Sequence, residues 1–223
     1  LSIAGPNSRK VLEKIVRDDV SNEKFKFRDS RRMFVGGVPA IINRISFTGE
    51  LGYEIYVAPH YQLKLYEELM EAGKEFNIKP FGGRALMSMR LEKNWGAWTL
   101  DYRPDFTAKE TGLDAFINWD KEFIGKESAQ KENSSNKLVP LIVETNEIDV
   151  TNNEAVLNGD QSIGYVTSGG FAHFVNKSVA FTFVDQKNIK SENKIQVEIN
   201  GDLFNCSIIK EPLYDPSGQK MRS

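Results

Sequence analysis

Residues 45–57, which read I-S-F-T-G-E-L-G-Y-E-I-Y-V, constrain the fold of this chain more than any other stretch. Apolar and aromatic residues on both sides of a glycine-containing centre predict a strand, a glycine turn and a second strand. Glu54 lies among apolar and aromatic neighbours in the second strand. Strand alternation allows it to be the solvent-facing neighbour of inward Tyr53 and Ile55. A carboxylate held on a strand can also accept two hydrogen bonds from adjacent donors of a flat heterocycle, so both interpretations stay open here.

Composition excludes several classes of protein. The chain has 223 residues, of which 40% are apolar and 27% charged, and its net charge is -2. These values are ordinary for a globular protein with one large or two small domains. The near-neutral charge gives no reason to expect nucleic acid or an anionic membrane as a partner, and no run of about 18 apolar residues is present. A single cysteine, Cys206, excludes an internal disulfide and fits a reducing compartment, and with His60 and His173 it cannot form a zinc-type cluster.

The start of the chain suggests that more sequence precedes it. Residues 1–4 are mostly apolar and are followed directly by Gly5 and Pro6, without the basic and then apolar pattern of a signal peptide. Domains seldom begin on a buried element with no lead-in. We therefore expect a piece of a longer protein, located in the cytoplasm or, in a eukaryote, in the mitochondrial matrix.

The first half of the chain mixes strands and helices. Residues 32–38 and 40–47 read as two strands joined by a Gly36-Gly37 hairpin turn. Apolar residues at helical spacing predict helices over residues 61–76 and 83–93. This half is therefore predicted to be a mixed sheet-and-helix domain.

The second half changes in composition. Residues 127–137 are polar and read as a short helix and a linker. Six short strands with turns between them then predict a small antiparallel barrel or sandwich: residues 138–143, 155–157, 162–167, 178–184, 194–199 and 203–209. We expect an α+β fold with a half-domain over 1–126, a linker over 127–137 and a barrel domain over 138–223.

The T-G-E-L-G-Y-E-I run at residues 48–55 resembles the T-G-E-x-G-(aromatic)-E-(aliphatic) signature of the glycine-cleavage T-protein family of folate-dependent aminomethyltransferases. Further motifs similar to those of the family follow in the same order along nearly the whole chain. They are L-S-I-A-G-P at 1–6, R-L-E-K at 90–93, F-I-G-K-E at 123–127, V-T-S-G-G at 166–170 and P-L-Y-D-P at 212–216. The form of the middle motifs is most similar to the C-terminal half of the dimethylglycine and sarcosine dehydrogenase branch.

The resemblance implies a set of folate-binding residues. It implies that Glu54 holds the pterin ring of tetrahydrofolate, with Phe47, Tyr53, Trp95 and Trp98 as the aromatic residues to consider at the pocket. Large aromatics at such positions are also common in cores.

One position departs from the family pattern. In T-proteins a pterin-contacting Arg lies four residues before the Arg of R-L-E, and here Leu86 occupies that position. Arg84 is two residues away, and because a helix turns about 100° per residue, this offset moves a side chain to another face. Arg84 is retained as a weaker cofactor-binding candidate. The family's catalytic Asp lies before the G-P motif, so we expect no catalytic residue and no metal ligand in this chain.

The resemblance implies a role in one-carbon transfer. A methylamine is oxidised elsewhere, by a flavin domain, and tetrahydrofolate captures the carbon as 5,10-methylenetetrahydrofolate. The expected cofactor is tetrahydrofolate, with FAD only in a domain that this chain lacks. The expected partners are folate and the missing N-terminal part of the parent protein. The chain alone is expected to be inactive.

Two alternatives remain open. One is a non-catalytic folate-binding or assembly module, which Leu86 would fit. The other is a different tetrahydrofolate-dependent methyl- or aminomethyltransferase.

A lesser candidate site is the expected turn at residues 168–170. Its backbone N–H groups could donate hydrogen bonds to an anion, or the turn could simply need glycine for its geometry. His173 lies in the loop after it.

Overall fold

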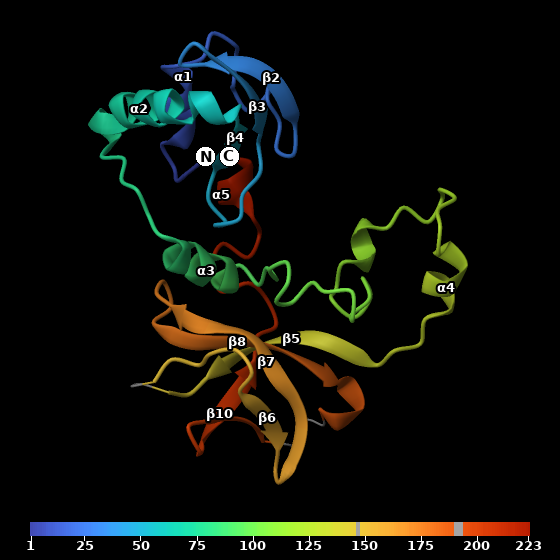
Figure 1. Ribbon diagram of the computed structural model, residues 1–223. Coiled ribbons are helices and arrows are strands. Elements are labelled where there is room, and N and C mark those ends of the chain that lie inside the picture. Colours follow the sequence, from blue (N-terminus) through green and yellow to red (C-terminus); the bar gives the residue numbers. More distant parts are fainter. Residues whose placement is uncertain (146–147, 190–193) are drawn as a thin grey trace. The chain divides into compact units, whose positions relative to one another are not determined.

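The computed structural model describes residues 1–145, 148–189 and 194–223, which form two compact units (Figure 1). The first unit contains residues 1–93 and 214–223, and the second contains residues 94–213. The patterns in the sequence placed the boundary across residues 127–137, whereas the compact units divide at residues 93/94 and 213/214. The last ten residues therefore pack with the start of the chain and not with the barrel that precedes them.

A four-stranded antiparallel sheet forms the centre of the first unit, in the order β1-β4-β3-β2. The predicted hairpin between β2 and β3 is confirmed, because Gly36 and Gly37 lie between them with φ of 58° and 77°. Glycine adopts these left-handed angles without a steric penalty, and they match the twist of paired strands. The strands are β1 (Ser2–Ala4), β2 (Ser30–Val35), β3 (Val38–Asn43) and β4 (Gly52–Tyr56).

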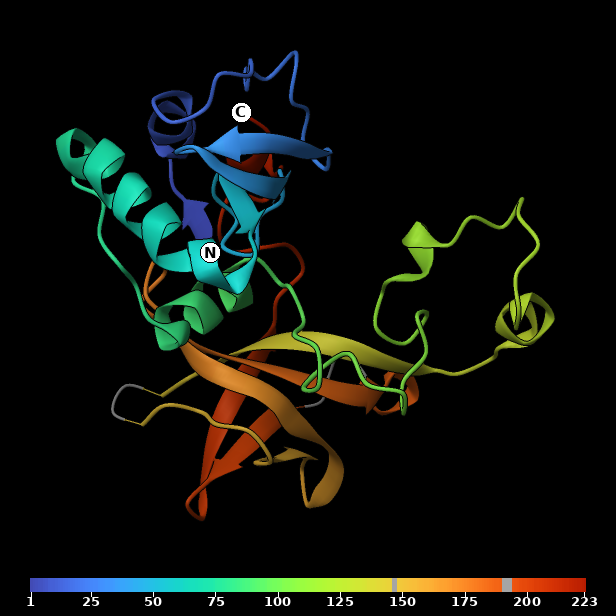
Figure 2. The same cartoon turned by 45° about the horizontal axis from the view of Figure 1, so that its top comes forward.

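Helices α1 and α2 cover one face of this sheet (Figure 2). Leu65 and Leu69 lie on one side of α2 at the i, i+4 spacing and pack with Leu12 of α1 against Ile42 and Ile55 of the sheet. The predicted helices over 61–76 and 83–93 are confirmed with small shifts at their ends. The helical elements are α1 (Ser8–Glu13), η1 (Pro59–Tyr61), α2 (Gln62–Gly73), η2 (Lys74–Phe76), α3 (Gly83–Glu92) and α5 (Gln219–Arg222).

The predicted strand before the glycine turn is wrong. β3 ends at Asn43 and β4 starts at Gly52, so residues 44–51 form an irregular connection. Local bonds from side chains replace ladder pairing here: Ser46 Oγ accepts from the Gly49 amide at 3.0 Å, and Thr48 Oγ1 accepts from the Glu50 amide at 3.2 Å. Serine and threonine compete with regular structure in this way.

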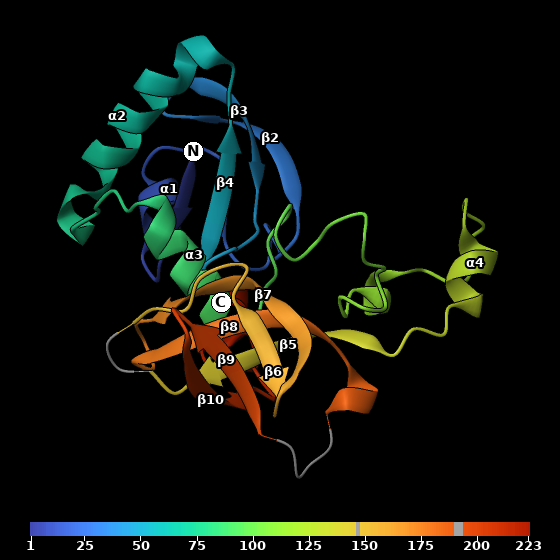
Figure 3. The same cartoon turned by 60° about the horizontal axis from the view of Figure 1, so that its bottom comes forward.

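The second unit contains a closed antiparallel barrel in the order β10-β5-β8-β7-β6-β9, which confirms the predicted β-barrel (Figure 3). Valine, isoleucine and leucine from alternate strand positions fill its core, among them Leu141, Val156 and Val197. The strands are β5 (Asn136–Val143), β6 (Ala155–Asn158), β7 (Gln161–Ala172), β8 (Lys177–Asp185), β9 (Ile195–Ile199) and β10 (Asp202–Ile208).

The rest of the second unit is mostly irregular. Phe106 stacks on Phe183 of the barrel, with 3.5 Å between the ring centroids. The helical elements outside the strands are η3 (Asp114–Phe116), α4 (Lys126–Lys131) and η4 (Gln186–Asn188). Within the described ranges, no helix has the length and apolar character needed to cross a membrane.

The expected turn at residues 168–170 is also wrong. These residues continue β7, and Gly169 pairs with Ala180 of β8 after a bulge in the strand. A Cβ on Gly169 would lie 2.5 Å from the carbonyl oxygen of Val150, closer than any normal contact. The glycine therefore permits close backbone packing within a strand, where the sequence pattern predicted a turn.

We predict that Gly169→Ala destabilises the barrel by about 2 kcal/mol, because overpacking at a rigid backbone contact costs about 1–3 kcal/mol. Urea unfolding followed by tryptophan fluorescence measures this, since all three tryptophans, Trp95, Trp98 and Trp119, lie in the second unit. Gly83→Ala in the first unit is the control, because a Cβ there meets nothing within 4 Å; its unfolding is followed by circular dichroism, since the tryptophans lie in the second unit. Equal stability of the two variants would contradict the prediction.

Candidate functional site

Glu54 lies on the face of the sheet opposite α1 and α2, which we call the outer face. Along β4 the side chains alternate: Tyr53 and Ile55 are buried in the core, while Glu54 is half-buried on the outer face. In the strand register Glu54 pairs with Ser2 of β1 on one side and with Asn43 of β3 on the other. The carboxylate therefore stands in the middle of a row of polar side chains.

Tyr56 holds the Glu54 carboxylate in place. The two residues are two positions apart on β4 and share the outer face, and the Tyr56 hydroxyl donates a hydrogen bond to Glu54 Oε2. This hydrogen bond, followed by the negative charge of Glu54, raises the pKa of Tyr56, so the phenol stays protonated as a donor. Strand alternation alone could have identified Tyr56, because residues i and i+2 always share a face.

Of the other proposed folate-binding residues of the first unit, Tyr53 lies on the opposite face of the sheet from Glu54. Tyr53 is 1% exposed on the opposite face, where it stacks on Phe25 with 5.8 Å between ring centroids. Phe47 is half-buried in the irregular 44–51 connection, and Arg84 is exposed near the start of α3. Tyr53 therefore serves the core, since a ligand on the outer face cannot reach it through the sheet.

Trp98 belongs to the second unit, where its side chain is 79% exposed. It packs edge-on against Tyr102, with 5.8 Å between ring centroids. Trp95, three residues before Trp98, is half-buried. Thr99, directly after Trp98, has a left-handed φ of 68°. An exposed tryptophan on such a constrained loop is available for stacking with a flat ligand.

A buried carboxylate, which sequence reasoning missed, fixes this loop. Asp101 is fully buried and accepts hydrogen bonds from the Ala97 amide at 2.8 Å and from Ser168 Oγ at 2.7 Å. The Thr167 hydroxyl also donates to it. The two hydroxyl groups of the V-T-S-G-G motif therefore hold the side-chain carboxylate of Asp101.

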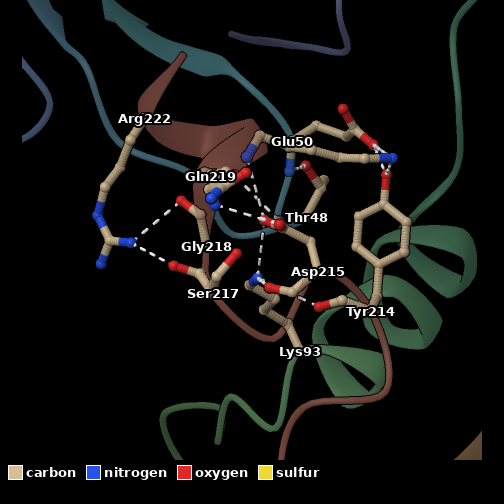
Figure 4. Close-up of polar contacts among 12 residues, drawn as sticks. Thr48, Glu50, Lys93, Tyr214, Asp215, Ser217, Gly218, Gln219 and Arg222 are labelled. Carbon is tan, nitrogen blue, oxygen red and sulfur yellow. Dashed lines mark hydrogen bonds and ion pairs between the residues drawn. The ribbon is translucent and has the colours of Figure 1, made fainter.

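A buried ion pair joins the R-L-E-K motif to the P-L-Y-D-P motif inside the first unit (Figure 4). Lys93 Nζ lies 3.2 Å from Asp215 Oδ2, and the two side chains are only 3% and 8% exposed. Lys93 also donates to the carbonyl oxygens of Tyr214 and Asp215. The Asp215 carboxylate further accepts from the Gln219 and Lys220 amides, both at 3.1 Å, at the start of α5.

The T-G-E motif meets the same cluster. The Tyr214 hydroxyl donates to Glu50 Oε1, and a Cβ on Gly49 would lie 3.0 Å from Lys93 Cδ. Three motifs that are far apart in the sequence therefore converge through Glu50, Lys93 and Asp215. Their side chains satisfy one another, so this cluster holds the unit together more than it offers groups to a ligand.

Cys206 and His173 lie in different surroundings. Burial raises the pKa of the Cys206 thiol to about 12, so it stays a neutral, partly buried side chain of the barrel. His173 is exposed and packs edge-on against Phe171. The part of the chain that the structure describes contains no group of three His, Cys, Asp or Glu side chains arranged to hold a metal ion.

We predict that Lys93→Met destabilises the first unit by about 3 kcal/mol, because it leaves the buried Asp215 carboxylate without its cation. Hydrogen exchange of the α2 amides measures the change in this unit. Lys74→Met is the control: Lys74 pairs with Glu71 at the surface, where both side chains are about 70% exposed. Loss of a surface pair costs less than about 1 kcal/mol. Equal protection in both variants would show that the buried pair contributes nothing.

The same pair predicts a dependence on pH. Burial acts to raise the pKa of Asp215, but the hydrogen bonds and charge of Lys93 and the α5 amides lower it overall. A lowered folded-state pKa gives stability that is present above the unfolded value of about 3.9 and is lost as the pH falls through the folded value. The stability difference between the native protein and Asp215→Asn should therefore shrink below about pH 4. A difference that stays constant over the same pH range would contradict this.

Comparison with known proteins agrees with this arrangement of motifs. Residues 1–121 match the GCVT N-terminal domain, and residues 136–215 match the glycine cleavage T-protein C-terminal barrel domain. Human mitochondrial dimethylglycine dehydrogenase is 35% identical over 96% of this chain, which spans 25% of that protein. An aminomethyltransferase from Bacillus mycoides is 33% identical over 97% of the chain, which spans 60% of its length.

A solved structure shows the same fold. The glycine cleavage system aminomethyltransferase T from Bartonella henselae superimposes with a TM-score of 0.81 at 24% identity, over 96% of this chain and 59% of that one. The chain thus spans a quarter to three-fifths of the length of these relatives. With both of its domains matched in order, this chain belongs to the glycine cleavage T-protein family.

Proposed function

We propose that this chain is the folate-binding part of an enzyme that transfers a methylamine-derived carbon to tetrahydrofolate. The observation that carries the proposal is Glu54, a half-buried carboxylate that Tyr56 orients on the outer face of the sheet. The names of the relatives, dimethylglycine dehydrogenase and aminomethyltransferase, support the reaction class.

The chemistry of the pterin ring fits a single carboxylate. Its 2-amino group and N3–H are adjacent donors on one edge, and a carboxylate accepts two parallel hydrogen bonds. Tyr56 occupies Oε2 with one hydrogen bond, and a carboxylate oxygen can accept a second. Hydrogen bonds to a charged group contribute about 1.5–3 kcal/mol each. Glu54 can therefore bind the pterin while remaining fixed by Tyr56.

The transfer itself needs no net oxidation. An iminium ion derived from the methylamine, or formaldehyde, supplies a carbon at the oxidation level of a methylene group. N5 and N10 of tetrahydrofolate each form a bond to that carbon, and the amine or water leaves with the protons of the two nitrogens. The product is 5,10-methylenetetrahydrofolate. In this proposal the two-electron oxidation that forms the iminium ion belongs to a flavin domain elsewhere, and the residues of this chain bind and orient the folate.

A second candidate is a non-catalytic folate-binding module. Leu86 favours it, because an apolar side chain there cannot donate to the pterin as the expected Arg would. A different tetrahydrofolate-dependent transferase is a further alternative within the same chemistry. Product analysis of the full-length protein, supplied with dimethylglycine or sarcosine and tetrahydrofolate, separates the three candidates. The proposed enzyme forms methylenetetrahydrofolate, a different transferase forms another folate product, and a non-catalytic module forms none.

We predict that Glu54→Gln weakens tetrahydrofolate binding by about 10- to 100-fold, because it removes a charged acceptor. Tyr56→Phe should cause a smaller loss, since it only frees the carboxylate to rotate. Isothermal titration of the full-length protein measures both. Glu67→Gln, an exposed acid on α2, is the control and should bind as the native protein does. Native affinity in Glu54→Gln would remove Glu54 from the site.

A further inference from the structure

A polar row crosses three strands of the outer face. The antiparallel registers place Ser2 and Asn43 directly beside Glu54, one on each neighbouring strand. Such direct cross-strand neighbours have Cβ atoms about 4.5–5.5 Å apart. Alternation along β3 puts Asn43 on the outer face, because Ile42 before it is fully buried. Asn43 is therefore within reach of a ligand held by Glu54.

The Asn43 amide has unused hydrogen-bonding capacity. Its side chain is half-buried, and within residues 1–145, 148–189 and 194–223 the structure records no hydrogen bond to it. By contrast, the neighbouring Glu54 carboxylate is held by Tyr56. An amide carries two N–H donors and one acceptor oxygen. A partly covered amide of this kind is free to donate to a bound molecule.

The order of groups along the row matches one edge of a pterin. The edge presents the 2-amino donor, the N3–H donor and the 4-oxo acceptor in sequence. Glu54 followed by Asn43 presents two acceptor oxygens and then a donor, which is the complementary order. We propose that Asn43 is a specificity-determining residue that donates from Nδ2 to the 4-oxo group of the pterin bound by Glu54. This inference rests on the proposed folate function and names the atom that distinguishes a 4-oxo pterin from its 4-amino analogue.

The test compares folic acid with its 4-amino analogue aminopterin, in which the 4-oxo acceptor is replaced by an amino donor and N3 loses its proton; the readout is therefore how each variant changes the binding of each ligand. In the full-length protein, Asn43→Ala should weaken folic acid binding about 10-fold and change aminopterin binding by less than about 2-fold. Asn43→Asp has the same shape but offers a carboxylate. It should weaken folic acid further and improve aminopterin, because the 4-amino group is a donor. The ratio of the two dissociation constants, measured by isothermal titration, is the readout.

The control is Ser30→Ala. Ser30 lies on β2 and pairs with Asn43 of β3, so it belongs to the same row but is one strand further from Glu54. Its side chain is exposed. It should leave both affinities unchanged, and circular dichroism should show that every variant is folded.

The outcomes separate this inference from the proposed function. Native folic acid affinity in Asn43→Ala, or an equal loss for both ligands, overturns the role of Asn43 while a loss in Glu54→Gln still supports the folate site. Failure of the native full-length protein to bind either ligand overturns both. A ligand ratio that shifts in Asn43→Ala and shifts further in Asn43→Asp supports the assignment, because a purely structural role would not discriminate between the ligands.

Discussion

The pleat of β4 is the constraint on which the candidate site depends. Tyr53 and Ile55 are each 1% exposed in the core under α1 and α2, so the strand cannot slip by one residue without moving both into solvent. Burying two such side chains stabilises the register by several kcal/mol at roughly 1.5–3 kcal/mol each. That burial is what holds Glu54 on the outer face.

The sheet depends in turn on residues far away in the sequence. Arg44, fully buried at the end of β3, donates to the carbonyl oxygens of Phe25, Arg222 and Ser223, the last at 2.7 Å. Burial lowers the pKa of its guanidinium. Together with the Lys93–Asp215 pair, it attaches the final segment to the first unit. A buried charge is costly unless it is paired and hydrogen-bonded. Lys93 meets this condition through the Asp215 carboxylate and two carbonyl oxygens. Arg44 is held by backbone oxygens alone, and its buried Nε has no hydrogen-bond partner.

The second unit uses a buried anion in a similar way. Asp101 has hydroxyl and amide donors around it, and they tie the loop that carries Trp98 to β7 of the barrel. The resemblance to the family pointed to Trp98, but the residues that position it could not be recognised as a group. Thr167 and Ser168 lie more than 60 positions from Asp101, and only the fold brings them together.

Periodicity and turn chemistry were sufficient for the strands of the barrel, the β2–β3 hairpin and the helices over 61–76 and 83–93, because these elements repeat a local pattern of burial. They failed at residues 45–47 and 168–170, where local side-chain bonds or tight backbone packing outweigh propensity. The motif order along the chain also identified the family. Tertiary structure decided the rest: that Asn43 stands beside Glu54, and that residues 214–223 return to the first unit. Pairing between distant strands and burial of charges are collective properties, so no local pattern encodes them.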